Sequence, residues 1–173
     1  IFRHSGAFFL RRSFKGDPLY PTVFRTYLRY VMQEGFPIEF FIEGTRSRTG
    51  KMLNPRFGIL KWLIQAYLEG ESPDVQFVPS SIDYEKIVES RAYVKELSGG
   101  EKRQEDVTGL LKSSEALKSK YGKIYVQIAD PISLNTILDE LNLPRSNLSA
   151  DQQRGVVQHT AYRIVFNISR VST

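Results

Sequence analysis

The chain has 173 residues, the length of one average domain, and its 41% hydrophobic and 12% aromatic residues are sufficient for a core. It has no cysteine, which excludes disulfides, thiol nucleophiles and cysteine–metal sites. A net charge of +5 favours anionic partners: phosphorylated metabolites, coenzyme A, an acidic carrier protein, anionic lipid or nucleic acid. Charge alone does not choose among them.

The first half of the chain alternates short apolar runs with segments of helical period, which is typical of an α/β fold. The strongest strand signal is the apolar run at residues 38–42, which is bounded by turn residues, as expected of a strand covered on both faces. Pro79 lies inside another apolar run, where it marks an edge, a bulge or an end. The expected elements are a strand at 7–10, a helix from Pro21 to about Gly35, a strand at 38–42, a helix at 58–68 and a strand at 75–82.

The second half begins with a charged stretch that we interpret as an excursion from the fold. The last helix has the clearest start, because Ser149 and Gln152 have the spacing of a capping box. The expected elements are the excursion at 85–106, a helix at 108–119, a strand at 123–128, a short helix at 135–141 and the last helix after Ser149. Together they predict a central mixed, largely parallel β-sheet flanked by helices, incomplete at the N-terminus.

The longest mostly apolar stretch, residues 57–68, is interrupted by Lys61 and Gln65. It is shorter than the roughly 20 residues that a membrane-spanning helix needs. We therefore expect no spanning helix and no signal peptide in this sequence.

A polar loop, residues 43–51, follows the expected strand at 38–42, and ligands of α/β folds bind at such strand ends. In an extended chain Arg46 and Arg48 project to the same side. Two guanidinium forks can then bind one dianion, and Lys51 adds a third positive charge. The alternative interpretation is a solvated basic loop.

A second basic group, Arg11, Arg12 and Lys15, follows the first expected strand. If the two strands are parallel neighbours, both basic groups lie at one edge of the sheet and form one phosphate pocket. Taken alone, the second group is also explained as surface arginines at a strand end.

Three short blocks carry a family resemblance. Residues 6–12 read G-A-F-F-L-R-R, residues 41–48 read F-I-E-G-T-R-S-R, and an expected strand contains Val78 and Pro79. They resemble the second, third and fourth blocks of the glycerol-3-phosphate and dihydroxyacetone-phosphate acyltransferases, with Leu10 in place of the usual isoleucine. The third block is matched without exception and is the specific one.

This resemblance implies transfer of a fatty acyl group from acyl coenzyme A or acyl carrier protein to the sn-1 hydroxyl of glycerol 3-phosphate, in phospholipid biosynthesis. Dihydroxyacetone phosphate is the alternative acceptor. It implies no metal, no bound cofactor and no nucleic-acid partner. Because the product and the donors are lipids, it also implies association with the cytoplasmic face of a membrane, through segments outside this chain.

The resemblance also implies roles for individual residues. Arg12, Arg46 and Arg48 would bind the phosphate, and Val78 and Pro79 would line the groove for the acyl chain. Glu43, Gly44 and Thr45 would shape the acceptor site. The remaining implied substrate-binding residues are Ser47, Lys15 and Lys51.

The general base of the family is a histidine in an H-x-x-x-x-D block, oriented by the aspartate. Phe9 lies five residues beyond His4, and Ile164 lies five residues beyond His159, so neither histidine fits. We therefore expect no catalytic residue in this chain. The catalytic histidine and aspartate would lie upstream of Ile1.

Residues 1–173 are accordingly interpreted as the central and C-terminal part of one acyltransferase domain, inactive by itself. Two alternatives stay open. One is a phosphate or nucleic-acid binding module without catalysis, and the other is a naturally inactive paralogue.

Overall fold

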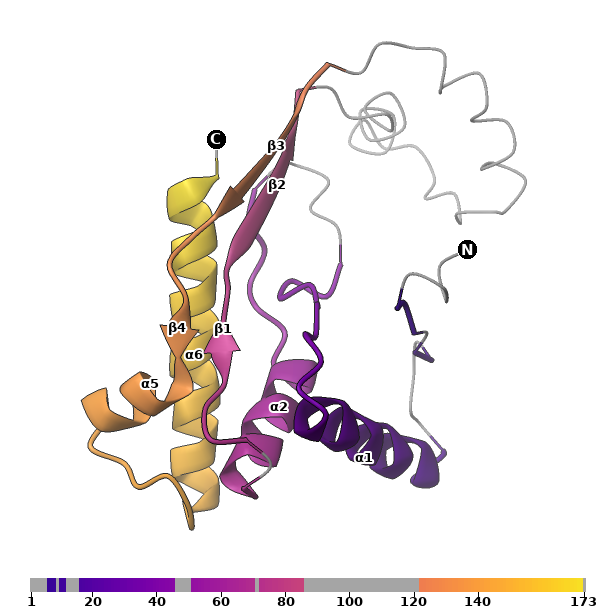
Figure 1. Cartoon of the computed structure of the whole chain (residues 1–173), viewed down its shortest axis with the longest axis vertical. Helices are drawn as coiled ribbons and strands as arrows, with labels where there is room; N and C mark the ends of the chain where they lie inside the picture. The colour runs from indigo at the N-terminus through magenta and orange to yellow at the C-terminus, as the bar shows by residue number, and fades with distance from the viewer. Residues whose placement is uncertain are drawn as a thin grey trace.

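The structure is a computed structural model that describes residues 6–8, 10–11, 16–45, 51–70, 72–85 and 122–172 (Figure 1). The expected helix at 108–119 and nearly all of the excursion at 85–106 lie outside these residues. In chain order the elements are α1 (Leu19–Gln33), α2 (Gly58–Leu68), β1 (Gln76–Phe77), β2 (Ser80–Tyr84), β3 (Ile124–Ile128), β4 (Ile132–Ser133), α5 (Leu134–Glu140) and α6 (Ala150–Val171).

The four strands form a long, interrupted, two-stranded antiparallel ribbon. β1 pairs with β4, Phe77 opposite Ile132, and β2 pairs with β3, Ser80 opposite Ile128. The interruption falls at Pro79, which has no backbone N–H to donate to a ladder. Its carbonyl instead accepts a hydrogen bond of 2.9 Å from the N–H of Ala129. Of the edge, bulge or end expected at Pro79, the structure shows an end, because β1 ends at Phe77 and β2 begins at Ser80.

The mixed α/β class is confirmed, but the described residues contain no large parallel sheet, since both strand pairs are antiparallel. The expected strand at 38–42 is wrong: these residues are in no ladder, and Phe41 is 74% exposed. Ala7, Phe8 and Leu10, from the first expected strand, are not in a strand either. The reason is that an apolar run predicts burial, whereas a strand also needs a neighbour to pair with.

α6 begins as the sequence predicts, with a complete capping box. The Ser149 hydroxyl accepts the N–H of Gln152 at 3.2 Å, and the Gln152 side chain accepts the N–H of Ser149 at 2.8 Å. One face of the helix is buried, and the hydroxyl of buried Thr160 donates to the carbonyl of Val156 at 2.8 Å. The buried residues of α6 are Val156, Val157, Thr160, Ala161 and Ile164.

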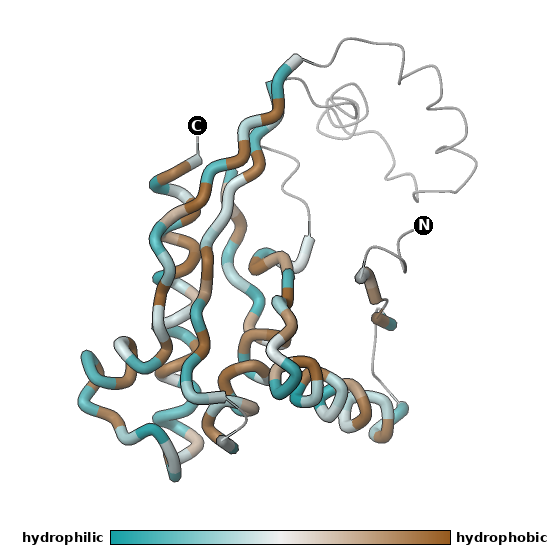
Figure 2. Tube along the Cα trace, viewed as in Figure 1, coloured by the Kyte–Doolittle hydropathy of each residue, from teal (hydrophilic) through white to brown (hydrophobic). Residues whose placement is uncertain are grey.

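α2 has the bounds that the sequence predicts and lies between α1 and α6 (Figure 1). It is apolar on most sides, as the brown colour along it in Figure 2 shows, and both Leu60 and Ile64 are fully buried. α1 packs on it through Phe24, whose ring meets Trp62 edge-on at 5.4 Å between centroids. Among the described residues, no helix is both long enough and apolar enough to cross a membrane.

Asp74 connects the start of the ribbon to the start of α5. One carboxylate oxygen accepts the N–H of Asn135 at 3.1 Å, and the other accepts the hydroxyl of Ser133 at 2.7 Å. Ser133 also caps α5, since its hydroxyl oxygen accepts the N–H of Thr136 at 3.2 Å. The side-chain amide of Asn135 donates to the carbonyl of Pro73 at 3.1 Å. Segments some sixty residues apart in sequence are thus held by one carboxylate.

Replacing Asp74 tests this connection. Asp74→Ala leaves the hydroxyl of Ser133 and the N–H of Asn135 without their acceptor, which costs about 1–3 kcal/mol. Hydrogen–deuterium exchange of the intact protein should show faster exchange across α5. Asp74→Asn should have a smaller effect because its amide oxygen still accepts. Asp130→Ala, at an exposed aspartate of the loop before β4, is the control; equal effects at both positions would contradict the role of Asp74.

Ionisation of Tyr67 lowers the stability of the fold at alkaline pH. Burial, with the nearby carboxylates Asp74 and Asp139, raises the pKa of its phenol above 10.0, against an opposing effect of Arg145. Its hydroxyl donates to the side-chain oxygen of Asn135. The unfolded chain therefore loses this proton before the folded chain does, and stability falls as the pH rises above about 10.

The free energy of unfolding, measured by denaturant titration at pH 8 and at alkaline pH, should fall less steeply with pH in Tyr67→Phe than in the parent. The variant should be less stable at pH 8, by about 1 kcal/mol, because it lacks the hydrogen bond. Parallel pH profiles for the two proteins would contradict the assignment.

Candidate functional site

The loop that begins at Glu43 is closed at its base by two hydrogen bonds. The carboxylate of Glu43 accepts the N–H of Leu53 at 2.7 Å. One residue earlier, the carbonyl of Ile42 accepts the N–H of Arg56 at 2.7 Å. Ile42 is buried in the core, so the base of the loop is attached to the rigid part of the molecule.

Gly44 makes the sharp turn at the start of the loop. Its φ angle is +65°, in the left-handed region that favours glycine, and its N–H donates to the carbonyl of Phe41 at 3.0 Å. A Cβ atom at this position would lie 2.9 Å from Cγ of Arg56. Both the backbone angle and the close contact with Arg56 therefore require glycine.

Four of the residues predicted to bind the substrate at this loop are described by the structure. Glu43 is half-buried, and Gly44, Thr45 and Lys51 are exposed. Arg46, Ser47 and Arg48 lie outside the described residues, so the convergence of the two guanidinium groups stays a prediction. The structure does show that the loop leaves and rejoins the core at a closed base.

The second basic group is described only in part, because Arg12 and Lys15 lie outside the described residues. Arg11 is engaged at the start of α1: its guanidinium is 2.7 Å from the carboxylate of Asp17 and 4.7 Å from the centre of the Tyr20 ring. The N–H of Arg11 donates to the hydroxyl of Tyr20 at 3.2 Å. Arg11 therefore contacts the residues at the start of α1. Phosphate binding by Arg12 and Lys15 stays a prediction.

Val78 and Pro79, the residues predicted for the acyl groove, differ in exposure. Val78 is 52% exposed, whereas Pro79 is buried. The burial of Pro79 is explained by its place at the interruption of the ribbon. Val78 is accessible to a ligand, and the groove itself stays a prediction.

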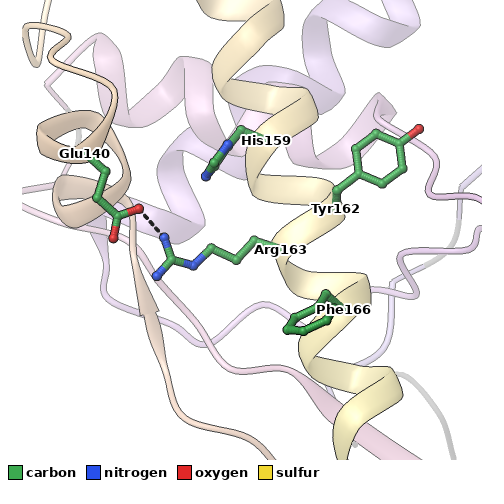
Figure 3. A pocket seen from close by; sticks show the side chains of 5 residues that line it. All are labelled: Glu140, His159, Tyr162, Arg163 and Phe166. Atoms are coloured by element: carbon green, nitrogen blue, oxygen red, sulfur yellow. Dashed lines mark hydrogen bonds and ion pairs between the residues drawn. The ribbon is translucent and has the colours of Figure 1, made fainter.

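Of the two histidines, His4 lies outside the described residues. His159 is exposed on α6 beside a shallow hollow of about 450 Å³ (Figure 3). The carboxylate that faces the hollow, Glu140, is paired with the guanidinium of Arg163. Ile164, five residues beyond the histidine, is buried. His159 therefore has no aspartate at the spacing of the family's base. The hollow is lined by Glu140, His159, Tyr162, Arg163 and Phe166.

No cluster of three or more histidine, cysteine, aspartate or glutamate residues that could bind a metal ion occurs in the described part of the chain.

Arg56 was not predicted from the sequence. Its backbone closes the loop, and its side chain lies against Gly44, which adds a basic residue next to the predicted phosphate-binding segment. It lies eight residues beyond Arg48, outside the three blocks that resemble the family. Only the closing contact with Ile42 reveals its place.

Each half of the chain matches a known protein family. Residues 1–83, which contain the loop, match the acyltransferase family. This match gives the class of protein, an acyltransferase. Residues 93–173 match the glycerol-3-phosphate acyltransferase C-terminal region. The chain belongs to the glycerol-3-phosphate acyltransferase family.

Similar proteins include glycerol-3-phosphate acyltransferases from three species of Pseudomonas. Those of Pseudomonas entomophila (strain L48) and Pseudomonas putida (strain GB-1) are each 45% identical over 140 residues, 81% of this chain and 17% of theirs. That of Pseudomonas fluorescens (strain Pf0-1) is 43% identical over 139 residues, 80% of this chain. The chain thus spans 17% of the length of these relatives.

The closed base of the loop is testable at Glu43. Glu43→Ala removes the acceptor of the Leu53 N–H, so hydrogen–deuterium exchange of the intact protein should be faster across residues 51–57. Glu43→Gln should exchange nearly as slowly as the parent because its amide oxygen can still accept. Glu39→Ala, at an exposed glutamate just before the loop, should leave this exchange unchanged. If the alanine variant at Glu43 matched the control, the proposed closure would be wrong.

Proposed function

We propose that the protein containing this chain is a glycerol-3-phosphate 1-O-acyltransferase. It transfers a fatty acyl group from acyl coenzyme A or acyl carrier protein to the sn-1 hydroxyl of glycerol 3-phosphate. The observation that carries the proposal is the block at 41–48, in which Ile42 belongs to the core and Glu43 closes the base of a loop by its bond to Leu53. The names of the relatives support the same activity.

In this proposal the loop binds the phosphate of the acceptor. Arg46, Arg48 and Arg12 supply guanidinium groups, which suit the planar, bidentate recognition of phosphate oxygens. Ser47, Lys15 and Lys51 add a hydroxyl donor and two further positive charges. Such charge-assisted hydrogen bonds contribute on the order of 1.5–3 kcal/mol each, so two or three of them account for binding of a small phosphate ester.

Glu43, Gly44 and Thr45 shape the acceptor site by fixing the start of the loop. Because the Glu43 carboxylate accepts a backbone N–H, its role in this proposal is to position the arginines that follow. The acceptor hydroxyl gives its proton to the general base and attacks the thioester carbonyl. An ester carbon–oxygen bond forms, the carbon–sulfur bond breaks, and the departing sulfur takes the proton. Val78 contributes to the path of the acyl chain.

We place the general base outside this chain, in a histidine–aspartate segment that precedes residue 1. Residues 1–173 then form the central and C-terminal part of one acyltransferase domain, and further strands complete a largely parallel sheet. Attachment to the cytoplasmic face of a membrane would likewise use segments outside this chain. The lengths of the relatives leave ample chain for these parts.

The full-length protein should transfer labelled palmitoyl groups from coenzyme A to glycerol 3-phosphate. Arg46→Ala and Arg48→Ala should each raise KM for glycerol 3-phosphate by about 10- to 100-fold, the equivalent of one lost charge-assisted hydrogen bond. KM for the acyl donor should change little. Arg154→Ala, at an exposed arginine on α6, removes the same charge away from the loop and is the control.

If transfer to dihydroxyacetone phosphate were faster than transfer to glycerol 3-phosphate, the proposed phosphate site would stand and the acceptor would be dihydroxyacetone phosphate. No transfer to either acceptor from coenzyme A or carrier-protein donors would overturn the proposal. Salt-sensitive binding of RNA or DNA by such an inactive protein would support the binding module instead.

A further inference from the structure

The ribbon of β2 and β3 has its polar face fixed against the rest of the molecule. Ser81 is buried, and its hydroxyl donates to one carboxylate oxygen of Asp83 at 2.7 Å. The other carboxylate oxygen accepts the hydroxyl of Ser172, at the end of α6, at 3.0 Å. These two bonds fix which face of the ribbon is directed toward α6, and therefore which face is directed away from it.

The opposite face is apolar and exposed. Ile82 lies opposite Val126, and Tyr84 lies opposite Ile124, so their side chains form a continuous surface across the two strands. Ile128 extends it toward the interruption at Pro79. The exposed fractions are 47% for Ile82, 55% for Tyr84, 61% for Ile124, 61% for Val126 and 67% for Ile128. The alternation of hydropathy along the ribbon is visible in Figure 2.

This arrangement reverses the usual pattern of a sheet with one solvated face, in which the apolar side chains face the core. A two-stranded ribbon is also only marginally stable in water unless its apolar face packs against further structure. Domains accordingly bury such a face beneath another layer. The β-branched side chains of this face are suited to contact with a packed layer.

We propose that this apolar face is an intramolecular interface, covered by an apolar element from the part of the same protein that lies outside residues 1–173. The chain spans 17% of the length of its relatives, so most of such a protein is available to supply the cover. The inference depends on the chain belonging to a longer protein and does not depend on the catalytic activity.

Among the described residues, the charges at the ends of the ribbon favour protein over an anionic membrane surface. The described ends of the ribbon carry two acidic residues, Glu85 and Asp130, and one basic residue, Lys123. The carboxylate of Glu85 accepts the N–H of Lys123 at 2.9 Å, which places it at the end of the ribbon. Membrane-binding surfaces instead border their apolar residues with clusters of lysine and arginine.

Photocrosslinking in the full-length protein tests the proposal. Val126→p-benzoylphenylalanine places the photoreactive probe at the centre of the face. Thr26→p-benzoylphenylalanine, at an exposed position on α1, is the control. Irradiation should give a product of monomer mass from the Val126 variant. Mass spectrometry of its peptides should then join residue 126 to a segment outside residues 1–173, and the control should not give this link.

A product of dimer mass would overturn the proposal in favour of a second copy, and a lipid adduct would overturn it in favour of a membrane surface. A crosslink confined to residues 1–173, or no crosslink, would also overturn it.

A smaller substitution guards against misfolding of the probe-bearing variant. The chain has no cysteine, so a cysteine introduced by Val126→Cys is the only one in residues 1–173. In the native full-length protein it should react with a maleimide at least tenfold more slowly than one introduced by Thr26→Cys. Equal labelling rates, with both sites reacting fully after denaturation, would overturn the proposal.

Discussion

Burial of one face of α6 against α2 and α5 is the contact on which the described structure depends. Val156, Ala161 and Ile164 from α6 meet Leu60 and Ile64 from α2 in one continuous core. The ribbon attaches to the same helix through the hydroxyl of Ser172, and α5 joins through Glu140 and Arg163. α1 lies one layer further out, beside α2, where the ring of Phe24 meets Trp62 and Met32 packs against the core (Figure 1).

The proposed phosphate-binding loop depends on that core. Its first anchor, Ile42, is a member of the core, and its second anchor, Arg56, lies two residues before α2. Both described ends of the loop are therefore attached to the core or to the start of α2. Glu43 then has a structural role that its chemistry alone does not reveal, since a carboxylate in a basic loop also suggests a partner for an arginine.

The two faces of the ribbon differ in what they contact. Its polar face is bonded to α6, whereas its apolar side chains face outward, as expected if another layer belongs there. The small share of each relative that the chain covers agrees with this proposal. The two proposals therefore concern different parts of this chain: the loop is proposed to bind a small anionic substrate, and the exposed face is proposed to contact the rest of the protein.

The sequence by itself determined the features that depend on neighbouring residues. The helix at 58–68, the capping box of Ser149 and Gln152 and the strand end at Pro79 were predicted, because short-range spacing specifies them. The family block at 41–48 is read directly from the sequence. Only the tertiary structure decided the rest. Residues 38–42 form no strand because a ladder needs a partner that composition cannot supply, and the ribbon is antiparallel because of pairings across some fifty residues. The contacts of Glu43 with Leu53 and of Ile42 with Arg56 likewise arise from chain reversal, which no local pattern encodes.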